Sequence, residues 1–133
     1  MLPRLKKRGE FVRASVSGLH ASTPGLVLQA YKRGEPEGEA EPPRVGFTTS
    51  KKVGNAVARN RARRRMRALA EAVLAPQAKP GLDYVLVGRT ATVDRPFSDL
   101  TRDLAEAIER VHTGRARPRR PRKPRGASAG KPT

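Results

Sequence analysis

The sequence predicts an α+β fold, an α/β sandwich in which helices pack on a small mixed sheet. Short apolar runs of strand composition alternate along the chain with stretches whose apolar residues recur at helical spacing. The chain has 133 residues, of which 36% are hydrophobic, so it can enclose only one modest core. We expect about four strands and three helices, in the order helix, three strands, helix, strand, helix.

The first predicted element is a short amphipathic helix over residues 9–17, with Phe11 on its apolar stripe. Gly18 is expected to end this helix. Strands are predicted over residues 26–32 and 44–50, because both have the alternating or apolar pattern of a sheet. The remaining strand of the expected order has no clear bounds in the sequence.

The segment between these two strands, residues 34–43, contains four glutamates, three prolines and two glycines. This composition predicts a solvent-exposed loop. A polyanion would repel its negative charge, so we expect the loop to face away from any surface that binds nucleic acid.

The most informative stretch is residues 51–67, which contains eight basic side chains and no carboxylate. We expect Gly54 to end the preceding strand, Asn55 to cap a helix, and the helix to stop near Pro76. At helical spacing one narrow face is apolar and the opposite face is cationic. Guanidinium groups form bidentate bonds with phosphate oxygens, so this face predicts a polyphosphate site. The apolar stripe comprises Ala58, Ala62, Met66, Leu69 and Val73, whereas Asn60, Arg63, Arg64 and Arg67 point the other way, with Arg59 and Arg61 on the flanks.

Two elements complete the predicted fold. Residues 83–88 form an apolar run that indicates a buried strand, and Ser98 is expected to cap a last helix that runs to about His112. The apolar stripe of this helix comprises Leu100, Leu104, Ala107, Ile108 and Val111.

Charge separates a folded body from a tail. The chain has 29 basic and 12 acidic residues, a formal charge of +17, which predicts a polyanionic partner. Residues 113–133 contain eight basic residues, four prolines and no acidic residue, so we predict a disordered tail there. Subtracting these eight charges leaves +9 on residues 1–112, the predicted folded domain, which is therefore basic without the tail.

Several other classes of protein are disfavoured. No stretch approaches the roughly 20 apolar residues of a membrane-spanning helix, and the first residues lack the apolar run of a secretory signal. The absence of cysteine excludes disulfides and thiolate metal sites, and it fits a cytoplasmic protein.

The sequence predicts no catalytic residue and no metal site in the protein. Its two histidines, His20 and His112, are separated by most of the domain, and no nucleophile with a base at recognisable spacing is present. Asp94, Asp99 and Asp103 could suggest a metal cluster, but acids are favoured in the first turn of a helix in any case.

The central signature consists of an apolar strand, a Ser-Lys-Lys turn, Gly-Asn-Ala-Val and Arg-Asn-Arg, and it resembles that of the bacterial ribonuclease P protein subunit family. The resemblance covers residues 4–112 and is sharpest over residues 45–67. Ala58 and Ala62 depart from the family pattern, where a basic and a larger aliphatic residue are usual. We expect one weaker backbone contact at the first position and thinner packing at the second.

The resemblance implies a left-handed β-α-β crossover through the arginine helix, in a fold shared with a domain of a small-subunit ribosomal protein. It also implies that an RNA subunit and its Mg²⁺ ions hydrolyse the precursor tRNA backbone and release the 5′ leader. The protein alone would be inactive. Its expected partners are that RNA subunit and precursor tRNA, with no membrane and no evident obligate protein partner.

The resemblance further implies two sets of binding residues. The RNA-subunit-binding set is Lys51, Lys52, Asn55, Arg59, Asn60, Arg61, Arg63, Arg64 and Arg67. The cleft that holds the single-stranded leader is expected to involve Phe11, Gln29, Tyr31, Lys51 and Arg89. Ser15 stands where relatives often have a second aromatic residue, so leader binding here would be weaker or would rest more on Lys51, Lys52 and Arg89.

Plainer interpretations remain open at this stage. Phe11 could be a core residue, Lys51 and Lys52 could be loop residues, and the tail could be a nonspecific cationic segment. A ribosomal protein or RNA chaperone would share the charge without requiring the Ser-Lys-Lys to Arg-Asn-Arg run. The Arg-Pro repeats of the tail suggest a DNA-binding protein with minor-groove hooks, but the Gly-Arg-Pro core of such hooks is missing. A secreted toxin or a nuclease is disfavoured, because the chain has neither disulfides nor a catalytic constellation.

Overall fold

The computed structural model describes residues 2–33, 42–114 and 117–118, and within them it confirms the predicted α+β fold. One mixed sheet has the strand order β3-β4-β2-β1-β5, in which β3 and β4 are parallel and the other neighbours are antiparallel. The strands are β1 (Leu19–Ser22), β2 (Leu26–Lys32), β3 (Arg44–Thr49), β4 (Leu82–Gly88) and the two-residue β5 (Arg117–Pro118). The helices are α1 (Arg8–Ser17), α3 (Ala56–Leu69), α4 (Thr90–Asp94) and α5 (Phe97–Thr113).

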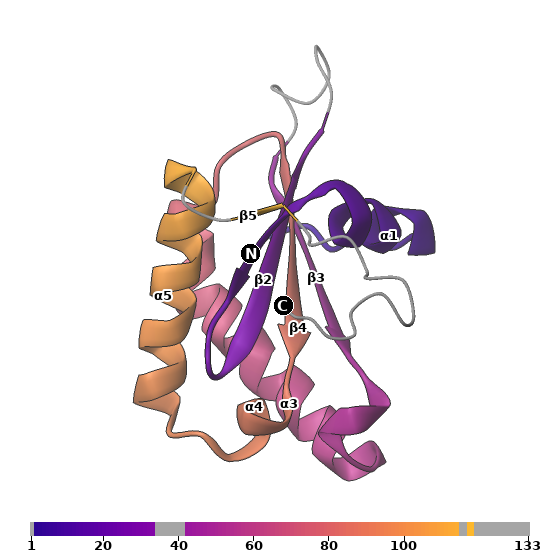
Figure 1. Cartoon of the computed structure of the whole chain (residues 1–133), viewed down its shortest axis with the longest axis vertical. Helices are drawn as coiled ribbons and strands as arrows, with labels where there is room; N and C mark the ends of the chain where they lie inside the picture. The colour runs from indigo at the N-terminus through magenta and orange to yellow at the C-terminus, as the bar shows by residue number, and fades with distance from the viewer. Residues whose placement is uncertain (1, 34–41, 115–116, 119–133) are drawn as a thin grey trace, which may run out of the picture.

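The helices divide between the two faces of the sheet. Figure 1 shows α1 on one face and α3 with α5 on the other. The chain leaves β3, passes through α3 behind the sheet and returns as β4 beside β3, which makes the expected left-handed crossover. Right-handed connections are the rule in other folds, so this topology is distinctive.

Alternation along the strands explains the two layers. On β4, Tyr84 and Leu86 are fully buried in the main core under α3 and α5, whereas Val85 packs with Ala14 of α1 on the other face. The larger core lies between the sheet and the two long helices. The smaller cluster under α1 covers only part of its face.

Short segments of the chain cover part of each edge of the sheet. Beside β3, the N–H of Leu5 donates to the carbonyl of Val45, and the N–H of Val45 donates to the carbonyl of Pro3. Beside β1, the strand β5 pairs its residues Arg117 and Pro118 with His20 and Leu19. β5 lies within residues 113–133, which were predicted to be tail, while the predicted acidic loop lies outside the described residues over positions 34–41.

The predicted helix ends are partly confirmed. Asn55 caps α3 as expected, since its side chain accepts a hydrogen bond from the N–H of Ala58 at 2.9 Å. The prediction that Ser98 caps the last helix is wrong, because α5 begins at Phe97 and its N-cap position is Pro96. The extended backbone of Pro96, with φ −52° and ψ 139°, sets the helix start without a side-chain cap.

Replacing Leu69 by alanine should test the orientation of α3. Leu69 is fully buried in the main core, so Leu69→Ala should lower the free energy of unfolding by about 2–5 kcal/mol in chemical denaturation. Val57→Ala on the same helix is the control, because Val57 is 75% exposed and its change should stay within about 0.5 kcal/mol. Superimposable curves for Leu69→Ala and wild type would contradict this packing.

Candidate nucleic-acid interface

A tight turn between β3 and α3 sets the start of the arginine helix. The Ser50 side chain accepts a hydrogen bond from the N–H of Lys52 at 3.2 Å, and residues Lys51–Val53 form a single 3₁₀ turn. Gly54 follows with φ 143°, which favours glycine, and a Cβ there would lie 2.9 Å from the Cβ of Ala58. The turn therefore fixes the direction in which α3 leaves the sheet.

The two faces of α3 lie as the sequence predicts. Ala62, Met66 and Leu69 are fully buried, and Ala58 is partly buried, as is Val73 in the π-helical turn Ala70–Leu74 that follows α3. The opposite side carries the exposed Asn60, Arg64 and Arg67, and a partly buried Arg63 that donates to the side-chain oxygen of Asn60 at 3.3 Å. Packing on the core thus holds a row of cations in fixed positions.

Two arginines of α3 instead contact the end of α4 and the residue that follows it. Arg61 Nε donates to the carbonyl of Val93 at 2.8 Å, and Arg65 donates to the same carbonyl and to that of Arg95. Burial lowers the pKa of the Arg65 guanidinium, and the nearby charge of Arg61 lowers it further. Arg61, predicted to face RNA, is exposed but already bonded, and Arg65 joins α3 to its neighbour.

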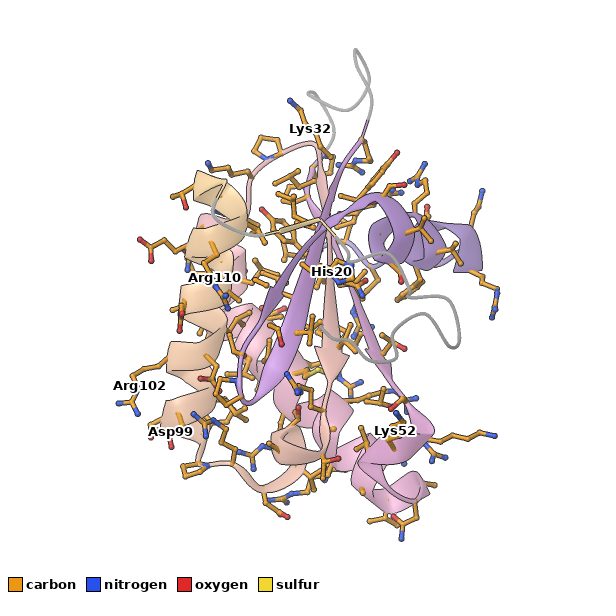
Figure 2. The ribbon with its side chains drawn as sticks, in the orientation of Figure 1. His20, Lys32, Lys52, Asp99, Arg102 and Arg110 are labelled. Atoms are coloured by element: carbon orange, nitrogen blue, oxygen red, sulfur yellow. The ribbon has the colours of Figure 1, made fainter. Side chains whose placement is uncertain are left out.

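The remaining members of the predicted RNA-binding set lie at the start of α3. Lys51 and Lys52 are exposed in the 3₁₀ turn, and Figure 2 shows Lys52 at the same end of the molecule as the start of α3. Arg59 is partly buried and donates to the carbonyl of Gly54 at 2.7 Å. Its side chain therefore also reinforces the turn.

A groove of about 660 Å³ lies between α1 and the open part of the sheet. Its lining mixes apolar and polar side chains with two cations. The lining residues are Lys6, Arg8, Phe11, Val12, Ser15, Gln29, Phe47, Thr48, Val85 and Val87.

Phe11 belongs both to the groove lining and to the packing under α1. Its ring packs over Gly46 of β3, where a Cβ would come within 2.6 Å of the ring, and it joins the small cluster under α1. Phe11 packs on the sheet and also lines the groove. It can therefore be a core residue and part of a binding surface at once.

The structure brings together only part of the predicted leader cleft. Phe11 and Gln29 line the groove, whereas Tyr31, Lys51 and Arg89 are not among its lining residues. Tyr31 lies under α1, where the guanidinium of Arg13 covers its ring at 4.8 Å. Arg89 donates to Ser22 Oγ at 2.8 Å and to the carbonyl of Thr23 at 3.0 Å, so it braces the turn between β1 and β2.

Sequence reasoning missed several groove residues and one buried carboxylate. Val85 and Val87 could have been identified from alternation, because Asp83, Val85 and Val87 share one face of β4. Asp83 is fully buried and contacts three arginines, which are distant from it in sequence. An acidic residue at the start of an apolar strand is the signal for such a group.

The described residues contain no group of three or more histidines, cysteines or acids that could hold a metal ion. Of the candidates weighed from sequence, Asp99 pairs with Arg102 on α5, and Asp103 accepts from Arg95 at 2.7 Å. No helix in the described part of the chain is long and apolar enough to cross a membrane.

Comparison with known proteins gives a consistent result. Residues 2–112 match the family model described as Ribonuclease P. The chain is 50% identical over 109 residues to the ribonuclease P protein component of Ruegeria pomeroyi, covering 81% of this chain and 85% of that protein. It is 49% identical over 110 residues to the same component of Paramagnetospirillum magneticum, covering 83% of each chain.

Solved structures agree on the fold. The RNase P protein from Thermotoga maritima superposes with a TM-score of 0.66 at 22% identity, covering 81% of this chain and 96% of that one. The RNase P protein from Staphylococcus aureus gives a TM-score of 0.64 at 23% identity, covering 82% and 94%.

Proposed function

Because this chain belongs to the ribonuclease P protein family, we propose that it is the protein subunit of a ribonucleoprotein that removes the 5′ leader from precursor tRNA. In this proposal an RNA subunit and its Mg²⁺ ions hydrolyse the phosphodiester bond in the cytoplasm. The protein binds both the RNA subunit and the leader, and it is inactive alone.

The fixed cationic face of α3 is the observation that carries the proposal. Arg64 and Arg67 are exposed on a helix whose other side is buried. Because this helix is already folded, binding does not incur the entropic cost of ordering a disordered arginine-rich segment. Residues 51–67 contain no carboxylate that would neutralise this face. Such a face would bind folded RNA chiefly through its phosphates.

The groove beside α1 suits the single-stranded leader. Phe11, Val85 and Val87 supply apolar surface on which bases can lie, and Gln29 supplies hydrogen-bonding groups. Lys6 and Arg8 line the groove, where they would neutralise the phosphates of the strand. We propose that these residues replace part of the cleft set expected from sequence, with Tyr31 and Arg89 in supporting positions.

A reconstitution experiment tests this function. Cleavage of a 5′-labelled precursor tRNA at low Mg²⁺ would be compared for the protein alone, a bacterial ribonuclease P RNA alone, and both together. We expect cleavage at the mature 5′ end only in the combined sample. RNA binding without rescue of cleavage would instead favour a general RNA-binding protein, which the same cationic face could also serve.

Introducing an aromatic residue at Ser15 should strengthen leader binding. Ser15 lines the groove beside Phe11, so Ser15→Tyr would add a second stacking surface worth about 1–3 kcal/mol per base. The measurement is the difference in Kd between precursor tRNA with and without its leader, on the assembled holoenzyme. Ser17→Tyr, at an exposed position outside the groove lining on the same helix, is the matched control. Equal gains for the two variants would contradict the assignment of this groove.

A further inference from the structure

A second hollow, of about 440 Å³, lies where β2 ends and β4 begins. It is far from the start of α3, since Figure 2 shows Lys32 and Lys52 at opposite ends of the molecule. It shares no lining residue with the groove beside α1. The lining residues are Lys32, Lys79, Pro80, Leu82, Val111 and His112.

Three nitrogen-bearing side chains from a strand, a loop and a helix line this hollow. Lys32 is the last residue of β2, Lys79 precedes β4, and His112 lies in the last turn of α5. Leu82 and Val111 supply an apolar wall, and none of the described lining residues is acidic. Two ammonium groups in such a hollow favour an anion.

A partly buried hydrogen-bond chain determines which ring nitrogen of neutral His112 carries the proton. The backbone N–H of Lys79 donates to the Tyr84 hydroxyl at 3.0 Å, and that hydroxyl lies 2.6 Å from Nε2 of His112. Because the hydroxyl oxygen already accepts from Lys79, its own proton is available to Nε2, and the neutral imidazole then carries its proton on Nδ1. Burial lowers the pKa of His112, and the charge of Lys79 lowers it further.

We propose that this hollow binds a phosphate group through Lys32, Lys79 and the imidazole of His112. The phosphate could be a free or terminal phosphate, or a phosphodiester of an RNA backbone. Neutral His112 would offer its Nδ1–H to the anion. An anion beside it also favours protonation of the ring, after which Nε2–H would donate to the Tyr84 oxygen. Phosphate binding and proton binding at His112 are therefore coupled in the same direction.

Charged and titratable groups from several elements surround His112. Arg110, two residues earlier on the same helix, donates to the carbonyl of Ser22 and pairs with Glu106. The groups that face or neighbour the imidazole are Lys79 from the preceding loop, Lys32 from β2, Tyr84 from β4, and Glu109 and Arg110 from α5.

Nuclear magnetic resonance titration of the full chain alone tests the proposal. The ring Cε1 proton of each histidine would be followed against pH in inorganic phosphate and in chloride of equal ionic strength. Phosphate should raise the midpoint of His112, by about one pH unit if the charged ring binds phosphate tenfold more tightly. The second histidine, His20, is the internal reference, and its midpoint should be the same in phosphate and in chloride.

Substitutions separate a site from general screening. Lys32→Met combined with Lys79→Met should abolish the phosphate-dependent shift, and the Lys79 backbone would still donate to Tyr84. Lys6→Met combined with Lys52→Met, which remove two lysines elsewhere, should preserve it. All four lysines are exposed, so neither pair should prevent folding.

A further arm identifies the source of the phosphate. A short oligoribonucleotide with hydroxyl ends offers only phosphodiesters, so a His112 shift in its presence would assign the site to RNA backbone. A shift with inorganic phosphate alone would assign it to a free or terminal phosphate. Absence of any shift, equal shifts at both histidines, or a shift that survives Lys32→Met with Lys79→Met would overturn the proposal. Because no RNA subunit is used, failure here would leave the proposed ribonuclease P function untouched.

Discussion

Replacing Asp83 by alanine should lower the free energy of unfolding by about 3–5 kcal/mol, the usual cost of removing one partner from a buried ion pair. Asp83 is fully buried at the start of β4. Arg44 donates to both of its carboxylate oxygens at 2.9 Å, and Arg13 and Arg33 each approach within 3.4 Å. Removal of the carboxylate would leave three guanidinium groups facing one another.

Asp83 influences both the ionisation of Arg44 and the contacts of α1. Its hydrogen bonds are the main cause of the raised pKa of Arg44, and Glu10 of α1 contacts the same guanidinium at 3.0 Å. Glu10 also accepts from the N–H groups of Lys6 and Lys7, so the start of α1 is connected to Asp83 through Arg44. Loss of Asp83 should therefore loosen α1 as well as the sheet.

Chemical denaturation followed by circular dichroism would measure the effect. The matched control is Asp99→Ala, which removes a partly exposed aspartate of α5 that pairs only at the surface with Arg102. Surface pairs contribute little, so the control should stay within about 0.5–1 kcal/mol of wild type. If Asp83→Ala lowered the free energy of unfolding no more than Asp99→Ala, the three arginines would have found water or other partners without cost.

Asp83→Asn keeps the shape of the side chain and removes its charge. Its free energy of unfolding should fall between those of Asp83→Ala and Asp99→Ala.

Replacing Arg64 and Arg67 together by alanine should weaken binding to the ribonuclease P RNA and flatten its salt dependence. Each phosphate contact adds nearly one unit to the slope of log K against log salt, so the slope should fall by about one to two units. Both side chains are exposed on the cationic face of α3, so stability should change little. The measurement is Kd for the RNA subunit over a series of salt concentrations.

Arg102→Ala is the control for loss of charge alone. Arg102 lies on α5, its side chain is 77% exposed, and Figure 2 shows it on the opposite side of the molecule from Lys52. Arg64→Ala and Arg67→Ala would be compared with it singly, since each of the three changes removes one positive charge. If Arg102→Ala flattened the slope as much as either α3 variant, binding would reflect net charge and not the proposed face.

Local sequence signals predicted α3 well because its determinants lie within a few residues. The spacing of Ala62, Met66 and Leu69 defines the buried stripe, and Asn55 caps the helix three residues before its bonded N–H. Ser98 was a weaker signal for α5, since a serine can occupy the first turn as well as the cap, and Pro96 set the start earlier.

The groove was harder to predict because it depends on contacts between distant residues. Gln29 and Tyr31 are two residues apart on β2 and so share one face of the strand. However, α1 crosses over Tyr31 and leaves Gln29 beside the groove. Nothing local to Arg89 indicates that it bonds the β1–β2 turn. Arg65 was not assigned to the predicted RNA-binding set, but nothing local indicates that it donates to the distant carbonyls of Val93 and Arg95.

The covered edges of the sheet have a consequence for self-association. An uncovered edge strand offers N–H and C=O groups to a second molecule and so promotes aggregation. Here Pro3 and Leu5 satisfy the outer edge of β3 at Val45, and β5 lies along β1. Two of the edge residues are prolines, Pro3 and Pro118, which have no N–H with which to extend the ladder. Two brief flanking segments thus shorten the edges that this small sheet leaves open to strand addition by neighbouring copies.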